Sequence, residues 1–333
     1  MPRPDVADSP PLVGGVAAGR SLSAHAGKVA TALVVVVSLA ACGGKSDTAN
    51  TGTPSPAPSP TVATAPGATT APTRTPSSPP HVLVIMEENK GYAATLGTCT
   101  ADPYFCSLAR KYLSFTNSHG VSHPSMPNYY AFISGATQGC ASDGCPPFSD
   151  PSLGSQLDAA GVPWAAYMES MPFACDRGNA GGYVVKHDPF VQSTAISGCA
   201  SHVLPYPGAK GMLEVLGSRL APEFAWITPN LTNDMHDGSV QQGDAWLAAN
   251  LKPILASPWF LSYPSTVIVT MDEGDTGSTN QIPTVIISSH ALGIGEVSTS
   301  INDYAVLRAI EDVYALGALR GAASAPEISS FVG

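Results

Sequence analysis

Acidic and amide side chains follow two strongly apolar segments of this 333-residue chain. Residues 81–86 are followed by Glu87, Glu88 and Asn89, and residues 266–271 by Asp272, Glu273 and, shortly after, Asp275. Apolar runs of this length predict strands buried on both faces. The carboxyl ends of such strands share one edge of an open α/β sheet, where ligand sites lie. One cluster alone would indicate solvated surface charge, but two on one edge predict a site for a divalent cation.

Ser125 stands two residues before Pro127. Proline favours the first turn of a helix, so the sequence predicts a helix over 127–134 with Ser125 just before it. Backbone N–H groups at such an end can bind an anion, and a nearby cation or base would activate the hydroxyl as a nucleophile. The spacing by itself also fits a serine that only caps a helix. A nucleophile-elbow serine hydrolase is not indicated, because the chain contains no G-x-S-x-G.

The remaining apolar periodicity predicts an alternation of strands and helices. Strands are expected at 81–86, 164–168, 224–228, 266–271 and 282–288, and helices at 102–112, 127–134, 152–160, 240–255 and 303–314. This alternation predicts an α/β fold with a mostly parallel sheet and helices on both faces. We expect it to occupy residues 81–333, a length that suits one domain.

Five segments resemble, in order, the motifs of a phosphoesterase family that includes bacterial acid phosphatases and phospholipases C. They are VIMEEN (84–89), SHPSMPNY (122–129), PNLTNDMHDGS with GDAWL (229–247), TMDEGD (270–275) and NQIPT (280–284). Each motif is moderately specific, and their ordered occurrence is strongly so. The resemblance covers 81–315 and is greatest to secreted acid phosphatases of the phosphatidylinositol-3-phosphatase type. It implies an alkaline-phosphatase-like fold.

The resemblance also implies roles for individual residues. The implied cation ligands are Glu88, Asn89, Asp272 and Glu273. The implied catalytic residues are Ser125 as nucleophile, with His187 and His236, and the implied substrate-binding residues are Asn128, Lys186 and Asp234. Asn128 in particular would donate a hydrogen bond to a phosphate oxygen. Phosphoryl transfer needs mainly positioning and charge stabilisation, which this set can supply.

One position departs from the family pattern. Relatives commonly carry His-Tyr before the last helix, where this chain has Asp303-Tyr304. The family histidine is a candidate catalytic or second-metal residue, so its replacement leaves that half of the site open.

Other conspicuous side chains receive structural interpretations. His119 and His123 are expected to be structural or to support the ligands rather than to bind the cation. His290 follows a predicted strand, so a role in the site is considered for it beside a structural one. Core packing is expected for Trp246, Tyr129 and Tyr130.

The first 41 residues have the organisation of a lipoprotein signal peptide. Basic residues precede an apolar run over 29–41 that is too short to cross a bilayer core of about 30 Å. The run ends Leu-Ala-Ala before Cys42, which resembles a lipobox and predicts acylation of Cys42. An ordinary cleavable signal with an incidental cysteine is the alternative. Residues 42–80 are rich in Pro, Thr, Ser and Ala, a composition that predicts a disordered tether.

Charge and cysteine content narrow the partners and the compartment. The formal net charge is −10 and no basic block follows the leader, so a nucleic-acid partner is not expected. Six cysteines remain besides Cys42, and an even number in an exported protein predicts disulfides, with 15 possible connectivities. A zinc cluster is disfavoured because the chain contains no C-x-x-C.

The family resemblance also bears on the disulfide pairing. Relatives retain counterparts of Cys145 and Cys175, which implies that these two pair. The pairs Cys99–Cys106 and Cys140–Cys199 would follow.

Together these features predict an extracytoplasmic acid phosphatase, either anchored to the cell membrane by lipid or secreted. It would hydrolyse phosphate monoesters, including phosphoinositides, through a serine nucleophile activated by a divalent cation. Two alternatives stay open: a phospholipase C-type phosphodiesterase, and a non-catalytic surface lipoprotein that binds phosphate ligands or a protein partner.

Overall fold

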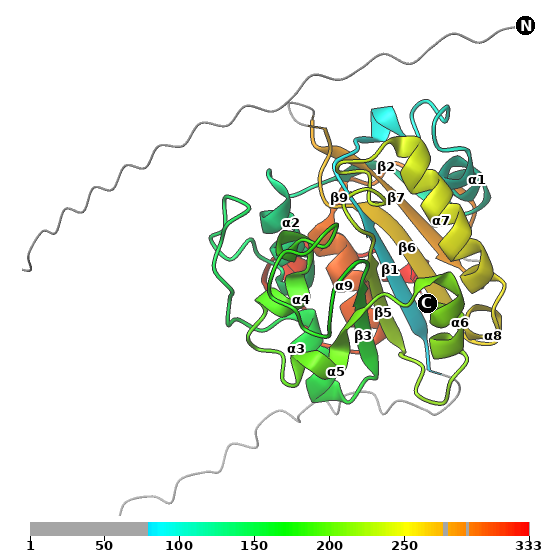
Figure 1. The fold of residues 1–333 in the computed structure, drawn as a ribbon. Helices are drawn as coiled ribbons and strands as arrows, with labels where there is room; N and C mark the ends of the chain where they lie inside the picture. Colours follow the sequence, from blue (N-terminus) through cyan, green and yellow to red (C-terminus); the bar gives the residue numbers. More distant parts are fainter. Residues whose placement is uncertain (1–78, 276–278, 291–292, 333) are drawn as a thin grey trace, which may run out of the picture. The chain divides into compact units, whose positions relative to one another are not determined.

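The computed structural model describes residues 79–275, 279–290 and 293–332, which form one sheet with helices on both faces (Figure 1). The predicted leader, Cys42 and the tether up to residue 78 lie outside the described residues. Within the described part, no helix combines the length and the hydropathy needed to cross a membrane.

The sheet contains nine strands in the order β4-β3-β5-β1-β6-β7-β2-β8, with β9 also paired to β2. The strands are β1 (His81–Glu87), β2 (Leu113–His119), β3 (Trp164–Met168), β4 (Val203–Pro205), β5 (Phe224–Thr228), β6 (Ser265–Met271), β7 (Gln281–Ser288), β8 (Gly295–Val297) and β9 (Ile301–Asn302). Only β7 runs antiparallel to its neighbours, β6 and β2. The predicted mostly parallel α/β sheet is confirmed, and each expected strand is present to within one residue.

Helices cover the two faces of the sheet in two groups (Figure 1). One face carries α1 (Pro103–Lys111), α6 (Gly208–Leu216), α7 (Val240–Leu255) and α8 (Pro258–Leu261). The other carries α2 (Ser125–Ser134), α3 (Leu153–Ala160), α4 (Pro189–Gln192), α5 (Cys199–His202) and α9 (Asp303–Val313). Short 3₁₀ turns lie at Tyr92–Ala94, Val185–His187, Arg320–Ser324 and Ser329–Phe331.

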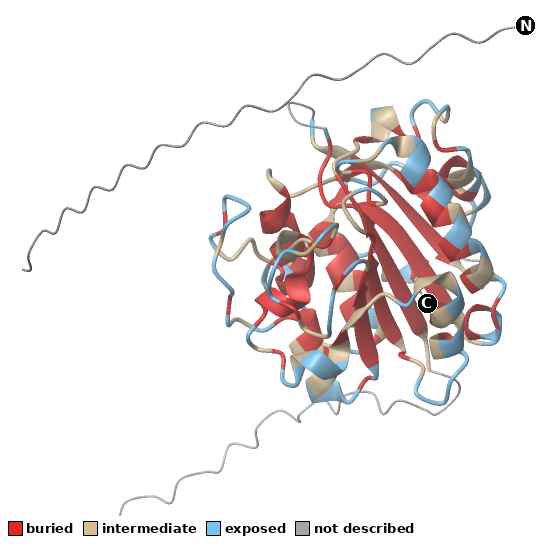
Figure 2. Cartoon of the chain, in the orientation of Figure 1, coloured by how far each residue is buried: buried red, intermediate tan, exposed pale blue. Residues whose placement is uncertain are grey.

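The core consists of two apolar layers, one on each side of the sheet (Figure 2). Side chains alternate along a strand, so β1 contributes Val82 and Val84 to one layer and Leu83 and Ile85 to the other. All four are fully buried. This explains why β1 reads as a continuous apolar run and why its position was predictable.

The direction of the strands defines two edges of the sheet. The carboxyl ends of the parallel strands β1, β3, β5 and β6 all lie on one side of the sheet, across the strand direction, and we call this side the site edge. Because β7 is antiparallel, it begins at the site edge and ends at the opposite edge. His290 follows β7 and therefore lies at the opposite edge, away from Glu88 and Asp272.

Three disulfides are present among the described residues, and two of them differ from the pairing implied by the family resemblance. The pairs are Cys99–Cys106, Cys140–Cys145 and Cys175–Cys199. Cys99–Cys106 is confirmed, whereas Cys145–Cys175 and Cys140–Cys199 are wrong. Cys140 and Cys145 lie in one short loop with Cα atoms 5.6 Å apart, and the Cys175 backbone N–H bonds to Val203 beside α5, which brings it to Cys199. Local chain geometry therefore decides both bridges.

Candidate active site

The two acidic clusters meet at the site edge, as predicted. The Asn89 backbone N–H donates to Asp272 Oδ1 over 3.3 Å, which ties the end of β1 to the end of β6. Asn89 has φ of 56°, a left-handed conformation that asparagine tolerates and that turns the chain after Glu88. Gly120, which follows β2, packs directly against the backbone after β6. A Cβ at this position would lie 2.7 Å from the Asp272 carbonyl oxygen, so a larger residue would not fit.

Ser125 lies between two carboxylates. It is the first residue of α2, two residues earlier than the predicted helix start, and is 1% exposed. Its hydroxyl donates to Glu88 Oε2 at 3.2 Å and to Glu273 Oε1 at 3.3 Å. The predicted convergence of Ser125 on the acidic clusters is therefore present, and the carboxylates are placed to accept a proton or to share a cation with the hydroxyl.

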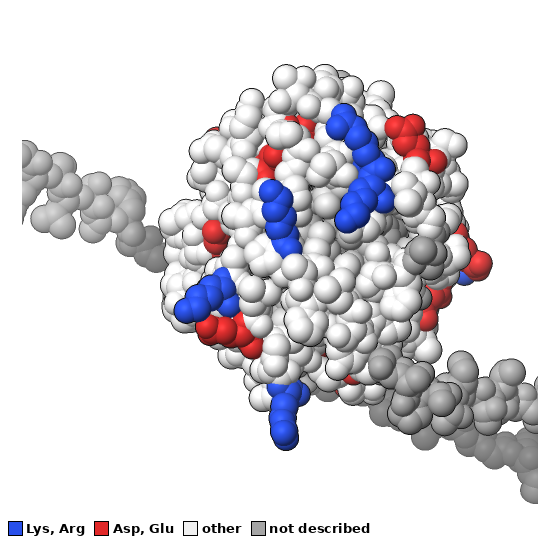
Figure 3. Space-filling model, turned by 90° about the vertical axis from the view of Figure 1, so that its right-hand side faces the viewer, with Lys and Arg blue, Asp and Glu red and all other residues white. Residues whose placement is uncertain are grey.

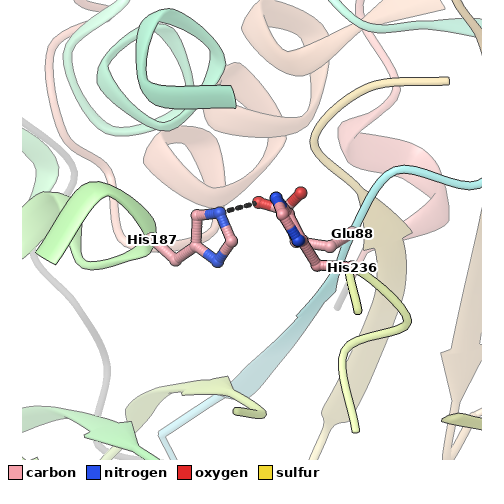
Figure 4. Close-up of side chains that lie close together, drawn as sticks. All are labelled: Glu88, His187 and His236. Carbon is pink, nitrogen blue, oxygen red and sulfur yellow. Dashed lines mark ion pairs between the residues drawn. The ribbon is translucent and has the colours of Figure 1, made fainter. Parts of the chain in front are cut away.

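Two histidines lie on the other side of Glu88. His187, at the end of the 3₁₀ turn Val185–His187, places Nε2 2.7 Å from Glu88 Oε1 and Nδ1 3.3 Å from Asp234 Oδ2. Ligand atoms of Glu88, His187 and His236 all lie within 4.8 Å of one another, converging from three separate segments (Figure 4). This group has the composition and spacing of a metal site.

A strained residue brings Asp234 and His236 into position after β5. Met235, between them, is fully buried with φ of 77°, a conformation costing about 1–3 kcal/mol in a residue other than glycine. Asp234 Oδ1 accepts from the His236 backbone N–H at 2.8 Å, and the Asp234 carbonyl oxygen accepts from the Glu88 N–H at 2.8 Å. The loop after β5 is thereby joined to the end of β1.

The raised pKa values of the buried carboxyl groups indicate why a cation would fit at this site. Burial, followed by the negative charges of neighbouring carboxyl groups, raises the pKa of both Glu88 and Asp272 well above its ordinary value. Among the described residues, Asp272 Oδ2 is buried without a hydrogen-bond partner, and Glu88 Oε1 and Asp234 Oδ2 form ion pairs with the ring nitrogens of His187. Buried carboxylate oxygens that converge on one place with so few donors match the ligands of a divalent cation, which would favour the ionised carboxylates.

A carboxylate that the sequence interpretation missed connects Lys186 to the start of α2. Asp143 Oδ2 accepts from Lys186 Nζ at 2.9 Å, and Asp143 Oδ1 accepts from the Met126 N–H at 3.1 Å. Lys186 Nζ also lies 3.2 Å from His236 Nε2. Burial would raise the pKa of Asp143, but these hydrogen bonds outweigh it and lower that pKa. The only signal in the sequence was an acid between two closely spaced cysteines, which resembles ordinary surface charge.

Several residues near this centre make hydrogen bonds, ion pairs or stacking contacts within the protein. Asn128, expected to bind phosphate, uses its amide within its own segment: Oδ1 accepts from Ser122 N–H, and Nδ2 donates to the carbonyl oxygens of Ser122 and Pro124. His123 pairs with Glu273, which agrees with a supporting role. Tyr129 is fully buried and stacks on His187 with ring centroids 5.3 Å apart.

Two further aromatic or imidazole side chains are structural, as expected. Trp246 is buried on α7, where its Nε1–H donates to Glu169 Oε1 at 3.2 Å. His119 at the end of β2 contacts Asn117 Oδ1 and the Thr279 carbonyl oxygen.

Asp303, at the position where the family resemblance implies a histidine, lies close enough to Asp272 to be affected by its charge. It begins α9, is 2% exposed, and has one oxygen, Oδ2, without a hydrogen-bond partner. Burial and then the charge of Asp272 raise the pKa of Asp303 well above its ordinary value. This chain therefore places one more buried carboxylate near Asp272.

Comparisons with known proteins agree with this geometry. A model of the phosphoesterase family matches residues 100–317. The phosphatidylinositol-3-phosphatase of Mycobacterium tuberculosis is 35% identical over 256 residues, covering 76% of this chain and 83% of that protein. The phosphate-repressible acid phosphatase of Penicillium chrysogenum is 31% identical over 185 residues, covering 53% of this chain but only 45% of that longer protein.

Solved structures show the same fold at low sequence identity. An alkaline phosphatase superfamily protein from Vibrio parahaemolyticus superposes with a TM-score of 0.54 at 12% identity, covering 74% of this chain and 70% of that chain. The lipoteichoic acid synthase LtaP of Listeria monocytogenes superposes with a TM-score of 0.54 at 8% identity, covering 76% of this chain and 75% of that chain.

The fold is thus an α/β fold of the alkaline-phosphatase type, and the chain belongs to the phosphoesterase family. It is a phosphoric ester hydrolase.

Proposed function

We propose that the protein is a metal-dependent acid phosphatase that hydrolyses phosphate monoesters outside the cytoplasmic membrane. The observation that carries this proposal is the buried Ser125 hydroxyl, held within 3.3 Å of both Glu88 and Glu273. A serine in such surroundings can act as a nucleophile once its proton is removed.

The cation ligands that we assign are Glu88, Asn89, Asp272 and Glu273. A bound divalent cation would lower the pKa of the Ser125 hydroxyl and neutralise charge on the phosphate oxygens. The buried carboxylates support this assignment, because their mutual repulsion is costly without a positive charge between them. Glu88, His187 and His236 form a competing ligand set, and metal content measured on variants distinguishes the two sets.

The reaction that fits these groups has two steps. Ser125 Oγ attacks phosphorus, its proton passes to a neighbouring carboxylate, and the ester P–O bond breaks with its electron pair on the leaving oxygen. His236 donates a proton to that oxygen, and its ring is held by Asp237 Oδ1 at 2.8 Å from Nδ1. Water then attacks phosphorus and gives a proton to His236, the Ser125 Oγ–P bond breaks to release phosphate, and the carboxylate returns its proton to Ser125 Oγ. Lys186 supplies a positive charge to the phosphate oxygens.

The relatives and the leader support the proposed substrate class and location. Sequence similarity to a phosphatidylinositol-3-phosphatase and to an acid phosphatase supports phosphate monoesters as substrates, with phosphoinositide headgroups among them. The motif ending at Cys42 supports a lipid anchor on the outer face of the membrane. Cys42→Ala should release the protein from membranes and abolish acyl labelling; unchanged retention and labelling would refute the anchor.

The decisive experiment is phosphate release by the purified mature chain with and without a chelator. We expect turnover of p-nitrophenyl phosphate that the chelator removes and that Ser125→Ala reduces by at least about a thousandfold with an unchanged circular dichroism spectrum. The bis-ester and the phosphorylcholine ester should be turned over more slowly. Preference for either of these two would favour the phosphodiesterase alternative, and full activity of Ser125→Ala would refute the serine mechanism.

A further inference from the structure

A cavity lies away from the candidate active site, between α1, α7, α8 and the end of β7. Its volume is about 650 Å³. The walls are mainly apolar, and include Leu108, Leu255, Phe260 and Ile286. Ser125 and its partners do not line it, so the proposed phosphatase activity leaves this cavity unexplained.

The charge of the cavity is opposite to that of the chain as a whole. The chain carries 25 acidic and 15 basic residues, yet the described residues that line the cavity include Lys111 and Lys252 and no Asp or Glu. The two ammonium groups lie over tyrosine rings, with Lys111 Nζ 5.0 Å from the Tyr112 centroid and Lys252 Nζ 4.7 Å from that of Tyr104. Figure 3 shows the corresponding face, with basic side chains near its middle and most acidic ones toward its margins.

The rim of the cavity exposes apolar side chains. Leu261 is 62% exposed and Ile294 is 77% exposed, and both line the cavity. They account for two of the four large apolar side chains that are exposed in the described chain. Exposed apolar groups beside lysines form an amphipathic surface, which suits a ligand with an anionic headgroup and an apolar body.

The attachment point of the tether favours a membrane over other amphipathic partners. The chain enters β1 at His81, whose ring stacks on Trp259 of α8 with centroids 4.6 Å apart. The same helix supplies Phe260 and Leu261 to the cavity. Cavity and tether attachment therefore lie at the same edge of the sheet, opposite the site edge.

We propose that this face binds the surface of a membrane containing anionic phospholipid. Lys111 and Lys252 contact the headgroup phosphates, while Leu261 and Ile294 enter the interfacial layer. Bound in this way, the protein holds the site edge away from that membrane. Substrate then reaches Ser125 from the solution rather than from the lipid beneath the domain.

Vesicle flotation tests the proposal with residues 42–333 carrying Cys42→Ser, so that neither leader nor acyl chain contributes. This chain keeps the whole described sheet and both of its apolar layers. We expect flotation with vesicles of phosphatidylglycerol and phosphatidylcholine, weak flotation with phosphatidylcholine alone, and loss of binding at 500 mM NaCl. The double variant Lys111→Glu/Lys252→Glu and the single variant Leu261→Asp should each weaken binding at least about tenfold.

Matched controls lie near the site edge. Phe173→Asp changes a side chain as exposed as Leu261, and Lys210→Glu changes a lysine that is 94% exposed on α6. Both should float like the unsubstituted chain, and all variants should retain turnover of p-nitrophenyl phosphate in solution. Equal binding to neutral vesicles, or unchanged binding of the cavity variants, would overturn the proposal. So would a dimer, detected by size-exclusion chromatography, that Leu261→Asp disrupts, since the face would then bind a second copy.

Discussion

Glu88 is the residue that joins the two halves of the candidate site. One of its oxygens accepts from Ser125 and the other approaches His187. The carboxylate can serve both because it is fully buried at the end of a central strand, where no solvent competes for it. Substitutions on the two sides of Glu88 should therefore have different effects. Those on the Ser125 side should change cation binding, and those on the His236 side should change protonation of the leaving group.

We expect Asp272→Asn and His236→Gln to separate these effects. Asp272→Asn removes a charged ligand, so metal affinity should fall about tenfold or more and added metal should partly restore the rate. His236→Gln should keep its metal content and lose more rate on alkyl phosphates than on p-nitrophenyl phosphate, because a phenolate leaves without protonation.

Metal content by mass spectrometry and turnover of the two substrate types check this expectation. If His236→Gln loses its metal and Asp272→Asn does not, the cation belongs to the Glu88–His187–His236 group instead.

At the scale of elements, the start of α2 depends on a loop that the Cys140–Cys145 disulfide closes. Asp143 in this loop binds the Met126 N–H, one of the donors expected to be free for an anion, and also holds Lys186. The nucleophile helix and the lysine therefore share one support. Pro127 has no N–H, so the helix start offers a substrate fewer backbone donors than its sequence suggests.

Asp143→Asn should mainly weaken substrate binding. The amide can still accept from Met126 but loses its charge toward Lys186, so we expect KM to rise about tenfold with a smaller change in kcat. The double variant Cys140→Ser/Cys145→Ser should raise KM in the same way, and Asp143→Glu should restore part of the loss.

The matched control is Cys175→Ser/Cys199→Ser, which removes a bridge next to β4 and α5. It should lower stability by about 2–4 kcal/mol without changing KM. Steady-state kinetics and thermal melting measure both quantities, and an equal KM effect in the two double variants would indicate general destabilisation rather than positioning.

At the scale of the whole molecule, one sheet separates two surfaces. The site edge gathers buried carboxylates, and the opposite edge carries the cationic cavity and the start of β1, where the predicted tether would join. The C-terminal segment stabilises this arrangement through Glu311 of α9, which is fully buried and accepts from the Leu319 N–H at 2.9 Å. Burial raises the pKa of Glu311 to about 7, from an ordinary value of 4.5.

This shift predicts a fold that is more stable in mildly acidic solution. Between about pH 4.5 and 7 the folded chain keeps a proton that the unfolded chain releases, so the free energy of unfolding falls as pH rises through this window. The contribution of Glu311 is at most about 3 kcal/mol. Glu311→Gln keeps an acceptor for Leu319 but cannot ionise, so its unfolding free energy should decline less between pH 5 and 8. Urea unfolding at both values checks this, and identical slopes would exclude Glu311 as the cause.

The sequence by itself predicted the central strands and which acidic residues would gather at the site edge. Buried strands need unbroken apolar runs, so β1, β5 and β6 were visible without a structure, and strand direction placed Glu88 and Asp272 at one edge. Strand β2 was missed because its second half, Thr116–His119, is polar, and only its neighbours in the sheet reveal it as a strand.

Only the tertiary structure decided which side chains contact one another through disulfides, ion pairs and hydrogen bonds. The antiparallel direction of β7 removed His290 from the site, and chain proximity paired Cys140 with Cys145. Asp143 gained its importance from Lys186, 43 residues away in the chain. Apolar periodicity records the burial of each residue separately, whereas ion pairs, disulfides and hydrogen bonds depend on distances between loops, which the packing of helices against the sheet sets.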